Sequence, residues 1–220
     1  MELFEAISTS RSIRRYQTDP VDEYLVWQCL KAAGYAPSGS NEQPWRFIVL
    51  DSPEARALLG PAYRKGAEWS MGIYGVSRPA DDDQSRRARM TRSMFELVDH
   101  FESIPYYVVF CTKLWDNLPD RLAGSAIYPA MQNFMLAARS FGLGTLPTMW
   151  FMECEDELRE LLELPEDWHI AALLPLGYPK GRHGPLYRMP IEELVHWNRF
   201  GNQRSAPPGL HLPGEVEGEP

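Results

Sequence analysis

Apolar residues recur at helical spacing in several stretches of the chain. Leu3, Phe4 and Ile7 share one face of a helix predicted over residues 3–9. Asp19-Pro20 is typical of an N-cap followed by proline, and it predicts a helix that ends at Gly34. Ser52-Pro53 predicts a short helix that ends near Gly60. The same periodicity predicts further helices over residues 90–101, 125–141 and 158–162.

Three short apolar runs predict buried strands, at residues 46–50, 106–111 and 170–176. Helices and strands mix without a regular strand–helix–strand alternation, which favours an α+β fold. The last residues are rich in Pro, Gly and Glu and cannot bury enough apolar surface to offset their ordering entropy. We therefore expect one domain over residues 1–204 and a disordered or surface-draped tail over residues 205–220.

The 220 residues carry a net charge of −8, and this acidity argues against nucleic-acid binding, which needs a basic surface to displace phosphate counterions. The N-terminus has no apolar leader pattern, and no apolar run approaches the roughly 18 residues of a membrane span. Cys29, Cys111 and Cys154 lie far apart, as in proteins of a reducing compartment. We expect a cytoplasmic protein without disulfides or a membrane segment.

Common hydrolase and metal-site motifs are not found in the sequence. The five histidines lack metal-ligand spacing, and no GxSxG, HExxH or GxxxxGK[ST] pattern occurs. Gly142-Leu143-Gly144 ends a predicted helix instead of opening one, so it does not form a dinucleotide-binding turn. We expect no metal and no side-chain nucleophile, and the chemistry is expected from an organic cofactor.

Two segments have unusual composition. Ser10 to Tyr16 reads SRSIRRY and places two guanidiniums and a hydroxyl close together, which suits a phosphate; a solvated basic linker is the alternative. Ala36 to Phe47 reads APSGSNEQPWRF, a polar loop whose amides could bind the edge of a heteroaromatic ring such as a flavin. An ordinary loop that anchors a strand is the alternative reading of the second segment.

With these two motifs in this order, the chain resembles the nitroreductase family of FMN enzymes. The PSG-x4-PW form is similar to the branch that contains iodotyrosine deiodinase and the flavin-cleaving enzyme of cobalamin biosynthesis. Later pieces also fit the family, and the likeness spans roughly residues 3–200: IYPAMQN at 127–133, GLGTLPT at 142–148, LGYP at 176–179 and YRMP at 187–190.

The resemblance implies a sandwich with a mainly antiparallel central sheet flanked by helices, in an intertwined homodimer that builds two identical flavin sites. It places the FMN phosphate and ribityl chain against Arg11, Ser12, Arg14 and Arg188. Four residues of the other subunit would lie along the flavin ring, namely Pro37, Ser38, Gly39 and Asn41. The loop of Thr145, Leu146, Pro147 and Thr148 would approach flavin N5, with either threonine as its neighbour.

The sequence also departs from the family. Ser10 stands where relatives often carry a basic residue, so we expect one contact fewer with the phosphate. The loop at 145–148 lacks the Glu-Gly pair of many nitroreductases, so the atom that reaches N5 stays open. No match to the deiodinase's substrate-clamping Glu, Tyr and Lys occurs between residues 62 and 103, which argues against a halotyrosine substrate.

The resemblance implies a ping-pong oxidoreductase in which NAD(P)H reduces tightly bound FMN, which then reduces a small electron-poor acceptor such as a nitroaromatic or a quinone. The alternatives are an enzyme that consumes reduced flavin with oxygen, of flavin-cleaving or reductive-dehalogenase type, and a non-catalytic flavin-binding dimer.

Residues 77–92 are a candidate lid, or else a solvated helix with Asp–Arg pairs. Arg182 and His183 either meet the nicotinamide nucleotide's phosphate or form a surface turn.

Overall fold

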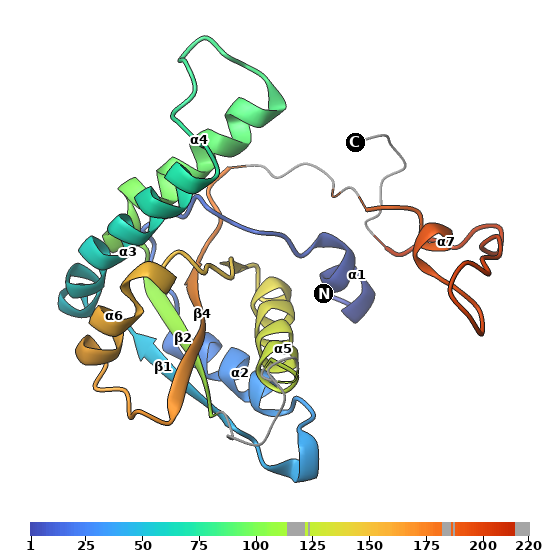
Figure 1. Ribbon diagram of the computed structural model, residues 1–220, viewed down its shortest axis with the longest axis horizontal. Coiled ribbons are helices and arrows are strands. Elements are labelled where there is room, and N and C mark those ends of the chain that lie inside the picture. The colour runs from blue at the N-terminus through green and yellow to red at the C-terminus, as the bar shows by residue number, and fades with distance from the viewer. Residues whose placement is uncertain (114–121, 123, 182–185, 187, 214–220) are drawn as a thin grey trace.

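A four-stranded antiparallel sheet with strand order β1-β2-β4-β3 forms the centre of the molecule, and helices cover both of its faces (Figure 1). The computed structural model describes all residues except 114–121, 123, 182–185, 187 and 214–220. The strands are β1 (Trp45–Leu50), β2 (Tyr106–Lys113), β3 (Gly144–Thr145) and β4 (Trp168–Gly177). The predicted α+β fold with an antiparallel sheet is therefore confirmed.

The described helices include α1 (Leu3–Thr9), α2 (Glu23–Gly34), α3 (Pro53–Ile73), α4 (Arg86–Asp99), α5 (Ile127–Ser140), α6 (Glu155–Leu161) and α7 (Ile191–Leu194). Short 3₁₀ turns lie at η1 (Gly39–Asn41), η2 (Phe101–Ser103) and η4 (Met152–Cys154). Among these helices, none combines the length and the apolar character that a bilayer span requires.

The two central strands are buried on both faces and separate two hydrophobic cores. Val108 and Phe110 of β2 pack into the core of α2 and α5. Tyr107 and Val109 point the opposite way, into the core that α3 and α4 complete. This alternation follows from the two-residue period of a strand. The continuous apolar run that predicted β2 reflects burial on both sides.

The second helix begins at Glu23 instead of at Pro20. Its N-cap is Asp22, whose carboxylate accepts a hydrogen bond of 2.9 Å from the Tyr24 N–H. The predicted cap at Asp19-Pro20 is therefore wrong, because a second aspartate three residues later supplies the acceptor. The predicted end of this helix at Gly34 is confirmed.

Helix α3 runs to Ile73, so the predicted stop near Gly60 is wrong. The helix contains Pro61 and continues because Leu59, Tyr63, Ala67 and Met71 form one buried stripe at four-residue spacing. Packing of this stripe against the sheet outweighs the hydrogen bond that proline cannot donate. The longer helix carries its C-terminal turns to the edge of the functional site.

Two glycines of α3 face close neighbours, and at Gly66 the neighbour is backbone. A Cβ at Gly66 would lie 1.7 Å from the carbonyl oxygen of Trp150. A Cβ at Gly60 would meet the Glu102 carboxylate at 2.1 Å. Because the Glu102 carboxylate is the end of a flexible side chain, Gly66 is the glycine that close packing of the helix requires.

The acidic residues 81–83 precede α4, which begins at Arg86 after an N-cap at Ser85. Arg92 reaches back from the helix and donates to the Ala80 carbonyl at 2.8 Å. The predicted solvated helix with Asp–Arg pairs is thus wrong for residues 77–85, since the basic side chain binds backbone carbonyls of a loop. The lid hypothesis for residues 77–92 stays a prediction.

The C-terminal residues leave the body as an arm that carries α7 (Figure 1). Helix α1 packs on α5, yet Leu3, Phe4 and Ile7 are exposed. The tail touches this helix, because the Ser8 hydroxyl donates to the Pro213 carbonyl. Residues 205–213 are mostly exposed, and the remainder of the predicted tail lies outside the described residues.

Candidate functional site

The segment that contains the predicted phosphate ligands is held between β3 and the chain that follows β4. The Ile13 N–H donates to the Thr145 carbonyl at 3.0 Å, and the Gln17 N–H donates to the Tyr178 carbonyl at 2.8 Å. Gly144 makes room for this approach, since a Cβ there would lie 2.7 Å from Ile13 Cγ1. Backbone pairing on both sides thus fixes the direction of the basic side chains between residues 11 and 14.

Arginines from both ends of the chain come together at this segment. Burial lowers the pKa of Arg11, and the nearby guanidinium of Arg188 lowers this pKa further. Burial is also the main cause that lowers the pKa of Arg14, to which Arg11 contributes in the same direction, while Tyr16 and Tyr63 oppose it. Like charges collected in a partly desolvated place favour an anionic ligand.

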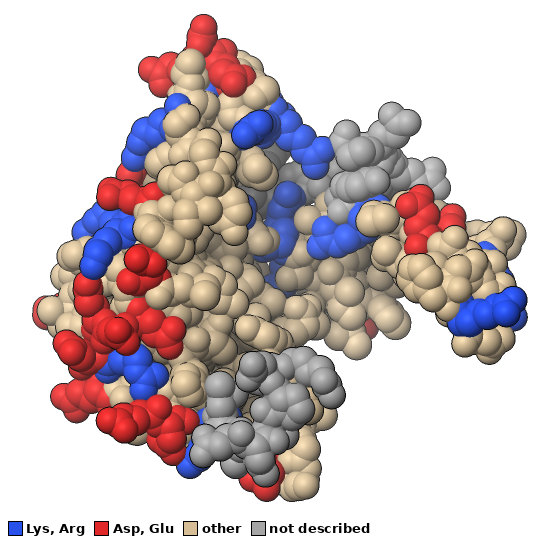
Figure 2. Space-filling view, in the orientation of Figure 1, with Lys and Arg blue, Asp and Glu red and all other residues tan. Residues whose placement is uncertain are grey.

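A recess separates the body from the arm, and Lys and Arg side chains are seen along it (Figure 2). Acidic side chains are prominent on the outer surface in the same view. An overall acidic protein therefore presents a local basic region, as an anionic cofactor would require. Arg182 and His183, the candidate contacts for a nicotinamide nucleotide, lie outside the described residues.

The predicted loop at residues 145–148 passes next to this segment. Thr148 pairs with Leu173 of β4, donating at 3.0 Å and accepting at 3.2 Å through its backbone. Pro147 has no N–H, so neither residue offers a free backbone donor. Thr145 and Thr148 are both buried, and any polar contact with a ligand must come from another group of the loop or from a side chain.

The Thr148 hydroxyl forms a hydrogen bond with a buried side chain. Its Oγ1 lies 3.1 Å from the Tyr63 hydroxyl, and either oxygen can donate. Tyr63 is itself stacked on Phe101, with ring centroids 4.5 Å apart. Burial raises the pKa of Tyr63 well above its usual value, so this hydroxyl keeps its proton and orients Thr148.

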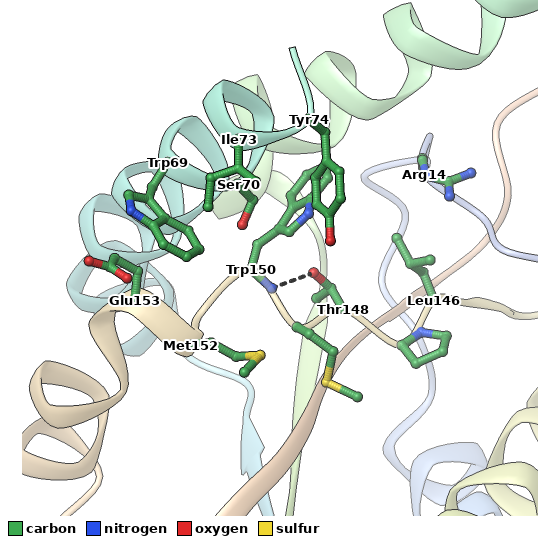
Figure 3. Close-up of a pocket in the computed structure, with 12 residues that line it drawn as sticks. Arg14, Trp69, Ser70, Ile73, Tyr74, Leu146, Thr148, Trp150, Met152 and Glu153 are labelled. Carbon is green, nitrogen blue, oxygen red and sulfur yellow. Dashed lines mark hydrogen bonds between the residues drawn. The ribbon is translucent and has the colours of Figure 1, made fainter. Parts of the chain in front are cut away.

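A pocket of about 590 Å³ opens beside this loop. Arg14 and the residues Leu146, Pro147 and Thr148 line one part of it. The end of α3 and the chain before α6 line the other part, through Trp69, Ser70, Ile73, Tyr74, Met149, Trp150, Met152 and Glu153 (Figure 3). The volume lies in the range of small-molecule sites.

The predicted ring-binding loop lies elsewhere in the chain. Pro37, Ser38, Gly39 and Asn41 surround η1, at the far end of the molecule from α4 (Figure 1). Within one chain the structure therefore does not bring this loop to Arg11, Arg14 and Arg188. The sequence-based prediction had assigned the loop to the other subunit's site.

The same loop has an uncommon backbone. Ser40, Asn41 and Gln43 have positive φ angles of 51°, 55° and 52°. The Ser38 hydroxyl accepts from the Gln43 N–H at 3.0 Å and helps to hold this shape. Several non-glycine residues in the left-handed region within one loop are typical of a functional segment.

Sequence reasoning missed the aromatic residues of the pocket. Trp69 and Tyr74 lie beyond the point where the helix was predicted to end, and Trp150 follows the predicted loop. Their spacing alone gives no sign of a ligand site, because aromatic residues are more often core residues. A prediction that α3 continues to Ile73 would have placed Trp69 and Tyr74 near the site.

No metal centre is present in the part of the chain that the structure describes, where no three His, Cys, Asp or Glu side chains gather suitably. Cys29 and Cys111 are fully buried, and burial raises the pKa of each thiol to about 12. Both therefore behave as small core residues.

The chain is similar to known proteins over most of its length. It is 30% identical to an NADH dehydrogenase of Thermus thermophilus, over 85% of this chain and 91% of that protein. It is 28% identical to 5,6-dimethylbenzimidazole synthase of Rhodospirillum rubrum, over 90% of this chain and 87% of the synthase.

Solved structures share the fold. Oxidized iodotyrosine deiodinase bound to FMN and 3-iodo-L-tyrosine aligns with a TM-score of 0.71 at 19% identity, covering 90% of this chain and all of that one. A family model described as the nitroreductase family matches residues 7–178. The chain belongs to the nitroreductase family.

Proposed function

We propose that the protein is a homodimeric FMN-dependent oxidoreductase that takes electrons from NAD(P)H and passes them to a small electron-poor acceptor. Family membership supports the reaction class, and relatives named as NADH dehydrogenase and 4-nitrobenzoate reductase support the donor and the acceptor class. The described site supports the cofactor, through its charge and its shape.

The residues fit the phosphate of FMN. Arg11, Arg14 and Arg188 would hold the dianion, and the exposed hydroxyl of Ser12 is close enough in sequence to add a hydrogen bond. Arg188 adds to the burial that lowers the pKa of Arg11, which supports the placement of both guanidiniums around one phosphate. A bound phosphate would relieve their repulsion and add charge-assisted hydrogen bonds.

The ring would need residues from two chains. Leu146, Pro147 and Thr148 offer an apolar surface with a buried hydroxyl on one side. Pro37, Ser38, Gly39 and Asn41 are too far away in the same chain (Figure 1), so a partner's copy of this loop would supply the contacts to the ring edge. A homodimer then builds two identical sites.

When bound, FMN supplies the two-electron chemistry, accepting a hydride from NAD(P)H and delivering electrons to the acceptor. The protein's part is to bind, orient and exclude water. Tyr63 fixes the Thr148 hydroxyl, and the aromatic side chains of the pocket cover the open side. One pocket that serves donor and acceptor in turn predicts ping-pong kinetics.

The single observation that carries this proposal is the gathering of Arg11, Arg14 and Arg188, of which Arg14 lines the pocket. The test is an absorbance spectrum of the purified protein, followed by anaerobic titration with NADH and with NADPH. Flavin bands that one nicotinamide bleaches, and that a quinone or nitroaromatic restores, are the expected result. A protein that neither contains nor takes up FMN would overturn the proposal, as would bound flavin that neither nicotinamide reduces.

A further inference from the structure

Four large apolar side chains around the pocket stay open to solvent. The exposed fractions are 49% for Trp69, 60% for Ile73, 78% for Tyr74 and 66% for Met152. They come from the end of α3 and from η4, two elements that pack together. Exposed apolar side chains gathered at one cavity indicate a binding surface and not a core.

The pocket is aromatic on the side away from the basic segment. Trp69 and Tyr74 project from α3, and Trp150 lies between them in the view of Figure 3. Aromatic faces and edges bind a planar ring with little loss of conformational entropy. Met149 and Met152 add thioether groups that adapt to rings of different outline.

The two ends of the pocket carry opposite charges. Arg14 lies at one end, and Glu153 lies with Trp69 at the other (Figure 3). In the proposed function Arg14 serves the cofactor, so the part left for an acceptor has a carboxylate at its border. An anionic acceptor would meet like charge there, whereas a cationic one would meet opposite charge.

We propose that Trp69, Tyr74 and Trp150 form an acceptor subsite that, with Glu153, selects neutral or cationic planar aromatic acceptors over anionic ones. This inference rests on the proposed function and specifies its acceptor. Trp69 would bind the acceptor ring, and Glu153 would determine which charge the ring's substituent can carry.

Lys65 limits the size of the effect. Its ammonium pairs with Glu157 at 2.6 Å, and its pKa is raised mainly by Glu157 and to a lesser degree by Glu153. Glu153 is therefore partly screened by a cation on the neighbouring turn of α3 and by solvent. We expect selectivity of about three- to tenfold, as for an exposed charge that acts over several ångströms in water.

The test compares three acceptors of matched shape with the FMN-loaded enzyme: nitrobenzene, 4-nitrobenzoate and 4-nitrobenzylamine, which is a cation at pH 7. In the wild type we expect kcat/KM to be highest for the cation and lowest for the anion. Glu153→Gln should raise the value for 4-nitrobenzoate and lower that for 4-nitrobenzylamine, with nitrobenzene little changed. Glu160→Gln removes an exposed carboxylate of α6 that does not line the pocket, and should leave the order unchanged.

Binding without turnover gives an independent readout. Calorimetric titration of the oxidised, FMN-loaded protein with benzylamine and with benzoate should show tighter binding of the cation, and Glu153→Gln should remove the difference. Trp69→Ala should weaken both about tenfold, and Trp69→Phe should restore most of the binding. Equal affinities in the wild type, or a charge preference that survives Glu153→Gln, would overturn the subsite.

The two proposals fail in different ways. Turnover of all three acceptors without regard to charge would support the proposed oxidoreductase and would overturn the proposed subsite. Selective binding of benzylamine by a protein that reduces no acceptor would support the proposed subsite and would overturn the proposed reaction.

Discussion

Arg11 and Arg188 lie far apart in the sequence and close together in the fold. Partial burial is the main cause that lowers the pKa of Arg11, and the guanidinium of Arg188 lowers it further. A ligand with two negative charges would convert the repulsion into attraction. The energetic value of these residues is therefore expected in binding and not in folding.

Arg11→Ala and Arg188→Ala should each weaken FMN binding by about 10- to 100-fold, because each removes charge-assisted hydrogen bonds worth roughly 1.5–3 kcal/mol. Fluorescence titration of the apoprotein with FMN measures the change. Arg87→Ala removes an exposed arginine of α4 and serves as the control. Affinity that stays within twofold in both variants would contradict the phosphate assignment.

The buried hydrogen bond between Tyr63 and Thr148 is a second residue-scale test. Tyr63→Phe removes the hydroxyl that lies 3.1 Å from Thr148 Oγ1 and leaves that oxygen with only the longer hydrogen bond of 3.4 Å from the Trp150 N–H. We expect the free energy of unfolding to fall by about 1–2 kcal/mol, as measured by urea denaturation. Tyr24→Phe, at an exposed position, should change stability by less than about 0.5 kcal/mol. A loss for Tyr63→Phe no larger than for the control would show that this bond adds nothing.

The thiols give a prediction on pH. Burial raises the pKa of Cys29 and Cys111 to about 12, and the thiolate is the reactive form. Raising the pH from 7 to 9 should therefore speed iodoacetamide labelling of the unfolded chain, whose thiols ionise near 8.5, and leave the native protein almost unlabelled. Mass spectrometry of the labelled peptides measures both. Rapid native labelling of either cysteine at pH 9 would disprove this protection.

At the scale of elements, the contact between α3 and the chain at Trp150 determines the shape of the pocket. Gly66→Ala would place a Cβ 1.7 Å from the Trp150 carbonyl oxygen, so the helix or the loop must shift. We expect a loss of about 2–4 kcal/mol in the free energy of unfolding, although alanine has the better helix propensity.

Gly72→Ala is the matched control on the same helix, where an added Cβ meets nothing within 4 Å. That variant should be neutral or more stable by up to about 1 kcal/mol. Thermal denaturation of the two variants together separates packing from propensity. Equal stability of both would show that the close approach is unimportant.

The elements that local patterns determine were predicted, and those that tertiary contacts determine were not. The strands at 46–50, 106–111 and 170–176 follow from apolar runs, and all three are present. Helix α3 was predicted too short because Gly60 indicates an end locally, whereas the buried stripe from Leu59 to Met71 is recognised only against the sheet. Asp22 was missed as the cap because Asp19-Pro20 offers the same local signal.

The same contrast between local patterns and tertiary contacts holds for the residues of the site. Arg11 and Arg14 stand in one dense motif, whereas Arg188 reaches them only through the fold. Trp69 and Tyr74 come to the pocket only because α3 continues and because Gly66 lets it pack against Trp150. No spacing along the chain encodes that approach, so sequence alone could not predict the aromatic side of the pocket.

At the scale of the whole molecule, the two groups of residues that we propose to bind FMN lie apart within one chain. The segment with Arg11 and Arg14 pairs with Thr145 of β3, and the loop of Pro37, Ser38, Gly39 and Asn41 lies at the end of the molecule opposite α4 (Figure 1). The apolar face of α1 is exposed, and the arm that carries α7 projects from the body. A second copy that covers α1 would bury this face and would bring its own loop to the first copy's arginines.

Replacement of Phe4 and Ile7 by glutamate should therefore convert a dimer into a monomer at micromolar concentration and reduce FMN binding together with it. Analytical ultracentrifugation with detection at the flavin band follows both properties in one experiment. Leu58→Glu is the control, since Leu58 of α3 is 60% exposed and Phe4 is 57% exposed, yet Leu58 lies on another face. Loss of FMN should follow dissociation because the ring-binding loop of one chain cannot reach its own arginines. A wild-type monomer that binds FMN tightly would refute the two-chain site.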